Sequence, residues 1–351
     1  MMKRKKTKKI YVGNVAVGGD SPITVQSMTN TKTSDVEATV AQIKQLESRK
    51  CDIIRVAVPD EEAVKAIPKI KKRINIPLIA DIHFNYQLAI ESIRKGADGI
   101  RINPGNIGSK EKLIKIVKEA MQANVPIRIG VNSGSLEKNI LKKYGKPSAE
   151  AMVESAMRSI ELFEKMGFFN FKISLKSSDV MTTIQSYRLI SDKTQYPLHV
   201  GVTEAGSYND GVIKSSIGIG SLLSQGIGDT IRVSLTSDPM KEVIVGNKIL
   251  KTLGLRDYGV DIISCPTCGR CSLNIEGIVE RVSRQTEGIR KPIKVAIMGC
   301  VVNGPGEARE ADVGIAGGEG YGVIFKRGKI IKKVREEEIV DSLMKEIQSM
   351  V

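Results

Sequence analysis

The first 240 or so residues repeat one pattern of apolar and polar positions. A short apolar run is followed by a polar or glycine-rich turn and then by an amphipathic segment. Short apolar runs between turn residues are typical of buried strands, and apolar residues three or four positions apart are typical of helices. The pattern predicts eight strands, at residues 23–26, 53–56, 78–81, 99–102, 127–130, 171–174, 198–201 and 230–233.

The segments between these runs carry helical periodicity. From Asp35 onward, Val36, Val40 and Ile43 fall on one stripe, and Asp35 stands where an N-cap is expected. Eight strands alternating with helices over about 240 residues predict a (β/α)8 TIM barrel. An open doubly wound sheet is the alternative. The regularity of the eight units disfavours it, as does the lack of a Gly-x-Gly-x-x-Gly run after the first strand.

The pattern changes near residues 251–262. A helical stretch at 243–250 leads to a predicted stop at Gly254, and the chain beyond it holds four of the five cysteines. About 95 residues are enough for a small independent domain. We therefore expect an α/β protein with a TIM-barrel domain at residues 1–250 and a smaller α+β domain at residues 251–351.

Composition narrows the class of protein. No apolar run approaches the roughly 20 residues that cross a bilayer, and no signal-peptide pattern follows the basic N-terminus, so we expect a cytosolic protein without a membrane partner. The formal net charge is +15, but aromatic residues make up only 4% of the chain and there is no Trp. Stacking platforms for nucleic acids are therefore scarce, and the charge favours anionic substrates or acidic protein partners over nucleic acid.

Polar side chains gather at the predicted carboxyl ends of the strands, where TIM-barrel enzymes place their active sites. Four strands deliver Arg or Lys to this rim, and the forked guanidinium suits a diphosphate. His83 has an alternative role as a hydrogen-bonded core residue. The candidates are Gln26, Ser27, Arg55, Asp81, His83, Arg101, Asn103, Arg128, Asn132, Lys172, Lys176, Glu204 and Ser234.

Two glycine-containing segments precede the last predicted strand. Residues 214–220 begin with Lys214, and residues 226–229 contain two glycines. Barrel phosphate sites are often built from glycine-rich loops in this part of the chain, because backbone N–H groups can approach the oxygens there. We expect these segments to help bind phosphate, with helix-ending glycines as the alternative.

The cysteines of the second domain point to a metal centre. An odd number of cysteines in a reducing compartment argues against a disulfide framework. Cys265 and Cys268 stand on one turn with Cys271 nearby, and Cys300 follows a predicted short strand at residues 295–299. Zinc would need all four thiolates because this domain has no His, and a thioredoxin-like redox pair would not meet a remote third thiol. Three thiolates with one non-thiolate ligand fit a 4Fe-4S cluster with one distinct iron. Glu307 is a candidate for that ligand, with a solvated turn residue as the alternative, and the spacing alone does not decide between them.

Several motifs together resemble the bacterial 4-hydroxy-3-methylbut-2-en-1-yl diphosphate synthase family. The most specific are Cys265-Pro266-Thr267-Cys268-Gly269-Arg270 and the stretch at residues 298–308 around Cys300. The resemblance covers nearly the whole chain. The other motifs that carry it are at residues 25–31, 80–84, 101–106 and 226–234.

The resemblance implies an oxidoreductase of the non-mevalonate (MEP) pathway of isoprenoid, or terpenoid, biosynthesis. It would convert 2-C-methyl-D-erythritol 2,4-cyclodiphosphate into the linear allylic diphosphate by two-electron reduction and loss of water. Reduced flavodoxin or ferredoxin would be the electron donor, and the family assembly is a head-to-tail homodimer.

The resemblance also implies roles for individual residues. Cys265, Cys268, Cys300 and Glu307 would hold the 4Fe-4S cluster, whereas Cys271 matches no family ligand. Asp81 and Glu204 would lie near the carbon skeleton, with Glu204 as the proton donor. The diphosphate would be bound by Arg55, Arg101, Arg128 and Lys176, assisted by Asn132, His83 and Ser234.

Overall fold

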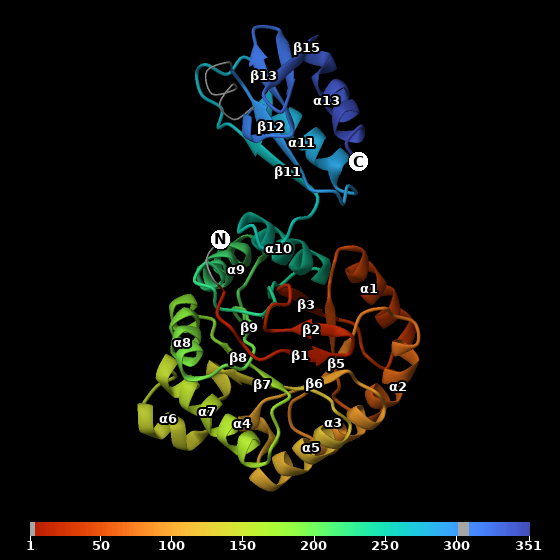
Figure 1. The fold of residues 1–351 in the computed structure, drawn as a ribbon. Coiled ribbons are helices and arrows are strands. Elements are labelled where there is room, and N and C mark those ends of the chain that lie inside the picture. The colour runs from red at the N-terminus through yellow and green to blue at the C-terminus, as the bar shows by residue number, and fades with distance from the viewer. Residues whose placement is uncertain (1–3, 301–308) are drawn as a thin grey trace. The chain divides into compact units, whose positions relative to one another are not determined.

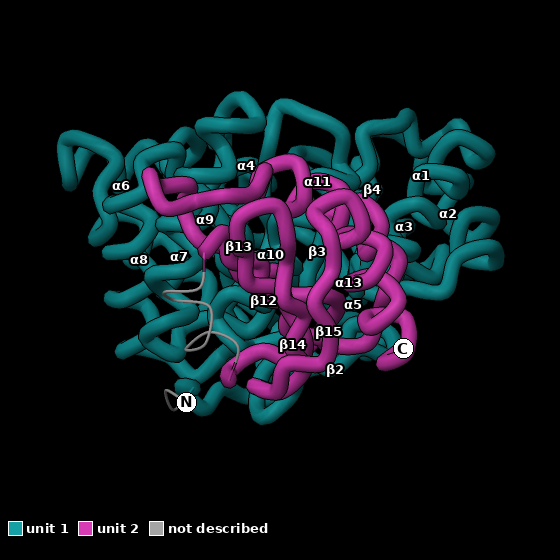
Figure 2. Tube along the Cα trace, turned by 90° about the horizontal axis from the view of Figure 1, so that it is seen from above, with its two compact units in different colours: residues 1–256 teal, residues 257–351 magenta. Residues whose placement is uncertain are grey.

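The structure is a computed structural model that describes residues 4–300 and 309–351. It divides into two compact units, residues 1–256 and residues 257–351, which Figure 2 shows in different colours. Arg256 belongs to the first unit because its guanidinium donates to Asn247 Oδ1, Ile23 O and Asp52 Oδ2, at 2.6, 3.0 and 2.6 Å.

The first unit is a barrel of eight parallel strands, in the order β8-β7-β6-β5-β4-β3-β10-β9 (Figure 1). An isolated parallel bridge between Ile173 and Leu198 joins the two ends of this order. All eight predicted strands are confirmed. They are β3 (Thr24–Met28), β4 (Ile53–Ala57), β5 (Leu78–Ile82), β6 (Gly99–Ile102), β7 (Ile127–Asn132), β8 (Phe171–Lys176), β9 (His199–Val200) and β10 (Thr230–Ile231).

Helices surround the barrel and join its strands (Figure 1). The predicted N-cap is confirmed, because the Asp35 carboxylate accepts the amide hydrogen of Ala38 at 3.0 Å. The helices are α1 (Val36–Ser48), α2 (Glu61–Lys71), α3 (Tyr86–Arg94), α4 (Pro104–Ile107), α5 (Lys110–Gln122), α6 (Lys138–Tyr144), α7 (Ala149–Lys165), α8 (Val180–Lys193), α9 (Tyr208–Leu223) and α10 (Pro239–Thr252), with a 3-10 turn η1 at Ser133–Ser135.

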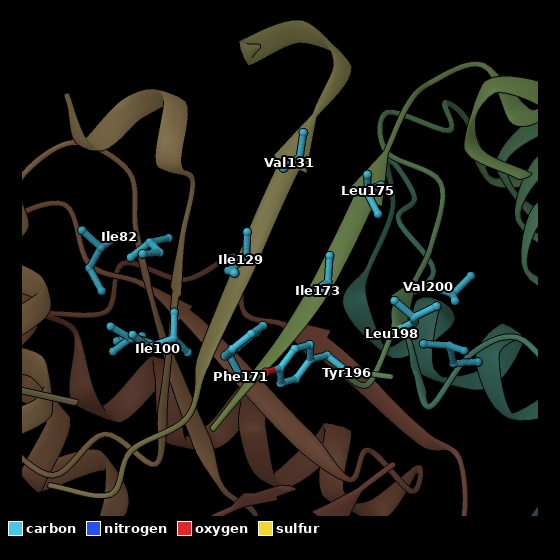
Figure 3. Close-up of a cluster of buried hydrophobic side chains, with 14 of the residues drawn as sticks. Ile82, Ile100, Ile129, Val131, Phe171, Ile173, Leu175, Tyr196, Leu198 and Val200 are labelled. Atoms are coloured by element: carbon cyan, nitrogen blue, oxygen red, sulfur yellow. The ribbon is translucent and has the colours of Figure 1, made fainter. Parts of the chain in front are cut away.

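Apolar and polar residues alternate along the barrel strands. On β8, Phe171, Ile173 and Leu175 belong to the large apolar core shared with the helices, and Figure 3 shows them beside their counterparts on β7. Successive side chains of a strand point to opposite faces. Lys172 and Lys176 therefore point into the barrel. The inside of the barrel is unusually polar, whereas the layer between the strands and the surrounding helices is apolar.

A hairpin that the sequence pattern did not predict covers the amino end of the barrel. Strands β1 (Ile10–Val12) and β2 (Val15–Val17) pair antiparallel. Their side chains form a separate apolar cluster with Ile53 and Ile79, which lie at the start of β4 and near the start of β5. The pattern of apolar and polar positions does not predict this hairpin because each of its strands has only three residues.

The second unit is a five-stranded mixed sheet with helices. The strands follow the order β11-β12-β13-β14-β15, in which β11, β12 and β13 are parallel and the rest antiparallel. Helices α11 and α13 share an apolar core with one face of this sheet. The elements are β11 (Val260–Ser264), α11 (Ile275–Thr286), β12 (Ile293–Met298), β13 (Val313–Gly318), β14 (Tyr321–Lys326), β15 (Lys329–Arg335), the 3-10 turn η2 (Glu336–Glu338) and α13 (Ile339–Gln348). Within the described residues, no helix has the length and apolar character needed to cross a membrane.

Candidate active site

Basic side chains from four strands, three of them adjacent, lie inside the barrel. Arg55 (β4), Arg101 (β6), Arg128 (β7) and Lys176 (β8) are each 7% exposed or less. Arg101 and Arg128 are register partners, so they point to the same side of the sheet. The structure therefore brings these four predicted residues within electrostatic range of one another.

Asp81, on β5 between Arg55 and Arg101, is the counter-charge of this group. Its carboxylate lies 3.7 Å from Arg55 Nε and 3.3 Å from Arg101 Nη1. His83 Nε2 lies 3.6 Å from the same carboxylate and 2.8 Å from Arg101 Nη1. Burial would raise the pKa of Asp81, but Arg55, His83 and Arg101 together hold it below its usual value.

A second buried carboxylate and its arginine did not emerge from the sequence. Glu242, in the first turn of α10, accepts hydrogen bonds from Ser27 Oγ at 3.1 Å and from the Leu235 amide at 3.0 Å. It also lies 3.4 Å from Arg232 Nη2. Arg232 directly follows β10, and its position between Ile231 and Val233 is the alternation that marks an inward residue. That alternation was the available signal, whereas Glu242 stands in the first turn of a helix, where acidic residues are favourable without any role in a site.

The buried cations outnumber the carboxylates that neutralise them. Burial lowers the pKa of Arg55 to about 9 despite the attraction of Asp81. Burial, with repulsion from Arg55 and Arg101, lowers the pKa of Arg128 well below its usual value. Burial and Arg128 do the same to Lys176. Arg128 Nε and Nη1 and Arg101 Nε have no hydrogen-bond partner among the described residues. Such groups need an anion, and a diphosphate supplies both charge and acceptors.

Two glycines leave room for these long side chains. A Cβ at Gly130 would lie 2.5 Å from Arg101 Nε. A Cβ at Gly201 would lie 2.7 Å from Lys176 Nζ and 2.4 Å from the Arg232 carbonyl oxygen. Atoms cannot approach this closely without displacement, so glycine at both positions allows the cations to reach across the barrel interior.

The remaining predicted site residues lie nearer the rim. Asn132 is half-buried and is the register partner of Lys176, and Ser234 is also half-buried. Glu204 is exposed on the turn after β9 and has a left-handed backbone, with φ of 52°. Left-handed non-glycine residues are uncommon and cluster at functional sites.

The glycine-containing segments do not form phosphate loops. Residues 214–220 lie inside α9, where a Cβ at Gly218 would meet the Val202 side chain at 2.6 Å. Glycine there permits close packing of the helix on the barrel. Residues 226–229 precede β10, at its amino end, where Asp229 accepts the Leu198 amide and an Arg4 guanidinium. The expectation for these segments was wrong because helix-packing and helix-ending glycines look the same in sequence.

Cys265 and Cys271 both lie near Gly299, each half-buried against an apolar cluster, and they differ in their hydrogen bonds. Cys265 directly follows β11, and its Sγ accepts the Gly299 amide hydrogen at 3.1 Å, next to Cys300 at the end of β12. Cys268 is exposed. Cys271 instead packs against the apolar core shared with the helices, and its thiol donates to the Leu273 carbonyl at 3.2 Å.

Glu307 lies outside the described residues. Among those that are described, no three His, Cys, Asp or Glu side chains are arranged to hold a metal ion. The donor types nevertheless suit an iron–sulfur cluster. Cys265 and Cys300 follow adjacent parallel strands, and a backbone N–H already donates to the Cys265 sulfur, as is common for cluster thiolates.

Comparisons with known proteins cover both units. Residues 7–247 match the model of the GcpE TIM-barrel domain, and residues 261–349 match that of the GcpE protein C-terminal domain. The chain belongs to the GcpE family. The family assignment agrees with the barrel and the smaller sheet unit, so the predicted fold class is confirmed.

Similar curated members of this family share a single printed name, 4-hydroxy-3-methylbut-2-en-1-yl diphosphate synthase (flavodoxin). The protein of Caldanaerobacter subterraneus subsp. tengcongensis is 62% identical over 99% of this chain and 98% of its own length. That of Thermodesulfovibrio yellowstonii is 58% identical over 99% and 100%. That of Aquifex aeolicus is 56% identical over 100% and 98%.

A more distant likeness concerns the fold alone. The N-acetylneuraminic acid synthetase of Leptospira borgpetersenii superposes with a TM-score of 0.51 at 13% identity, covering 72% of this chain and 92% of that one.

Proposed function

We propose that this chain is an oxidoreductase that converts 2-C-methyl-D-erythritol 2,4-cyclodiphosphate into 4-hydroxy-3-methylbut-2-enyl diphosphate, as the relatives' name indicates. Two electrons and one proton enter, a carbon–oxygen bond of the ring breaks, and one hydroxyl leaves as water. The observation that carries the proposal is the excess of buried cations at the carboxyl end of the barrel, which only an anionic ligand would neutralise.

The diphosphate would be bound by Arg55, Arg101, Arg128 and Lys176. Preorganised cations in a water-poor site stabilise charge far better than solvated ones do. Arg101 Nε and Arg128 Nε and Nη1 have no partner in the described structure, so they can donate without first breaking a bond. Asn132, His83 and Ser234 would add hydrogen bonds at the rim, and we add Arg232, which Glu242 orients.

Proton handling would fall to two carboxylates in different settings. Asp81 is buried and ionised between Arg55 and Arg101, so it would orient these two cations and the carbon skeleton rather than donate a proton. Glu204 is exposed, and its strained left-handed backbone holds it on the turn that follows β9. It would deliver the proton to the substrate.

The cluster ligands would be Cys265, Cys268, Cys300 and Glu307. When bound, a 4Fe-4S cluster supplies single electrons and an iron that acts as a Lewis acid. The chain's own contribution on this side includes the Gly299 N–H, which donates to Cys265 Sγ. Cys271 would take no part, because its thiol donates to the Leu273 carbonyl oxygen.

Reduced flavodoxin or ferredoxin would be the electron donor, in agreement with the flavodoxin of the relatives' name. Both carriers are acidic, and the net charge of +15 favours their approach. A head-to-tail homodimer in the cytoplasm completes the proposal.

Anaerobic turnover of the cyclic diphosphate with a chemical reductant tests the function. We expect about four irons per chain and one linear diphosphate formed per two electrons consumed. Stoichiometric zinc without iron, or no product from a chain with its full iron content, would contradict the proposal.

A matched pair of variants tests the ligand set. Cys268→Ser should lose iron and turnover. Cys271→Ser, only three residues away, should keep both, because this thiol is bonded to Leu273. Loss of iron from Cys271→Ser would show that the wrong thiols were chosen. The iron content and the visible absorption of the purified proteins report this independently of activity.

A further inference from the structure

Two titratable groups inside the barrel are not among the cations assigned to the diphosphate. Lys172 is two inward positions before Lys176 on β8 and is 1% exposed, and His199 on β9 is 0% exposed. The bridge between Ile173 and Leu198 places β8 and β9 side by side here, so both side chains face the interior. Lys172 Nζ and both ring nitrogens of His199 have no hydrogen-bond partner among the described residues.

The groups around this pair are cationic or neutral. Arg128 of β7 is the register partner of Lys172, and Lys176 follows on the same strand as Lys172. Repulsion from Arg55 of β4 also lowers the pKa of His199. Thr230 of β10 is the register partner of His199 and also of Thr24 on β3. From outside, Tyr187 of α8 contributes only hydrogen bonds to the backbone of Leu175 and His199.

None of the three buried carboxylates described in the first unit neutralises the pair. Asp229, which precedes β10, is engaged with Arg4, Thr7 and the Leu198 amide. Asp81 is engaged with Arg55, Arg101 and His83. Glu242 is engaged with Arg232, Ser27 and the Leu235 amide. A proton on Lys172 is therefore opposed by burial and by Arg128, and negative charge at the diphosphate site would favour it directly.

We propose that Lys172, with His199 beside it, is a proton-binding site coupled to the anion site, taking up a proton when a diphosphate binds among Arg101, Arg128 and Lys176. The inference rests on the proposed function, because it requires a diphosphate at that place. It assigns Lys172 a role in charge balance, separate from direct substrate contact.

The expected pH range follows from the free protein. Burial, followed by Arg128, lowers the pKa of Lys172 to about 7. Burial, followed by Arg128, Lys176 and Lys172, lowers the pKa of His199 well below its usual value, so the ring is neutral. Below this pKa Lys172 already carries its proton, and bound negative charge raises its pKa. Proton uptake is therefore small near pH 6 and largest at about pH 8.

Calorimetric titration of the cyclic diphosphate into the anaerobically purified full chain, without reductant, tests the coupling. Each phosphorus of this ligand has a single, strongly acidic oxygen, so the ligand itself does not titrate between about pH 6 and 8. In buffers of different ionisation enthalpy, the slope of the binding enthalpy counts the protons taken up. We expect a slope approaching one proton at about pH 8 and much less at about pH 6.

Substitutions at two lysines identify the residue that takes up the proton. Lys172→Met should still bind the ligand while the slope falls below half of the wild-type value. It should fold, because replacing a buried charge with an apolar side chain of similar size is often neutral or stabilising. Lys214→Met, on the exposed face of α9, is the matched control and should keep the full slope.

The outcomes separate the two proposals. Binding by the wild type with no proton uptake, or an unchanged slope in Lys172→Met, overturns this inference and leaves the proposed function standing. If Lys172→Met does not fold, a wild-type slope that is the same at both pH values overturns it equally well. Absence of any binding by the wild type overturns the proposed function, and this inference with it.

Discussion

The two ends of the barrel interior differ sharply although the same strands build both. On β4, Ile53 belongs to the apolar cluster with the N-terminal hairpin, and Arg55 lies two residues further along. On β5, Ile79 and Asp81 repeat this change. One inward position thus separates an apolar residue of the cluster with the hairpin from a charged residue of the proposed site. The comparison teaches that the amino end keeps the barrel folded, whereas the carboxyl end carries charge that folding alone would disfavour.

The largest effect is expected from removing a buried cation at the carboxyl end. Arg128→Met should lower kcat/KM by roughly 1,000-fold, because a charged hydrogen-bonding group in a desolvated site contributes several kcal/mol to binding. The melting temperature should stay the same or rise, since an unpaired buried charge is lost. Steady-state kinetics and thermal unfolding measure the two effects. The exposed Arg94→Met, which loses only its pair with Glu119, is the control.

The amino end should respond in the opposite way. Ile79→Ala removes a side chain that is 1% exposed in the cluster with the hairpin. We expect unfolding free energy to fall by about 3 kcal/mol, with kcat/KM nearly unchanged in protein that remains folded. Ile330→Ala, at a position that is 75% exposed, should change neither quantity. A large loss of kcat/KM in folded Ile79→Ala would break the comparison.

A smaller effect on kinetics is expected from filling the space that Gly130 leaves beside Arg101. Gly130→Ala places a Cβ 2.5 Å from Arg101 Nε, and the flexible arginine must move. We expect KM to rise by about 10-fold with little loss of stability. At Gly134 a Cβ meets nothing within 4 Å, so Gly134→Ala should leave KM unchanged. An unaltered KM in Gly130→Ala would mean that Arg101 does not bind the diphosphate from this position.

The smallest expected change in stability concerns the backbone of Glu204. Glycine adopts a left-handed conformation without strain, so Glu204→Gly should raise the unfolding free energy by less than about 1 kcal/mol. Glu204→Gln keeps the strain and should leave stability unchanged. Both variants should bind the cyclic diphosphate and fail to turn it over. Full turnover by Glu204→Gln would remove this residue from proton delivery.

Much of the barrel was predictable from the sequence. Each strand is a short apolar run, and the strands of a (β/α)8 barrel all run in the same direction. Apolar runs such as residues 171–174 mark strands, and parallel strands bring their carboxyl ends together, so the sequence predicts that Arg55, Arg101 and Arg128 lie close together. The same logic missed the hairpin, whose three-residue strands carry too little periodicity.

Side-chain contacts explain the other differences between the sequence predictions and the structure. Lys214 and the glycines after it suggested a loop, but close contact with Val202 makes glycine necessary within a helix. Glu242 reaches Arg232 from the first turn of a helix, which no strand pattern reveals. Sequence spacing alone left Cys271 beside Cys268 as an equal candidate. The hydrogen bond from its thiol to the Leu273 carbonyl oxygen distinguishes it.

The central claim is that the buried cations at the carboxyl end exist to bind a diphosphate. The shift in melting temperature that the cyclic diphosphate causes, measured anaerobically on the full chain and on Arg128→Met, tests it most directly. We predict a rise of several degrees in the wild type, because a ligand that binds only the folded state stabilises it. We predict no rise in Arg128→Met, from an equal or higher starting temperature. No shift in the wild type, or the full shift in Arg128→Met, would contradict the claim.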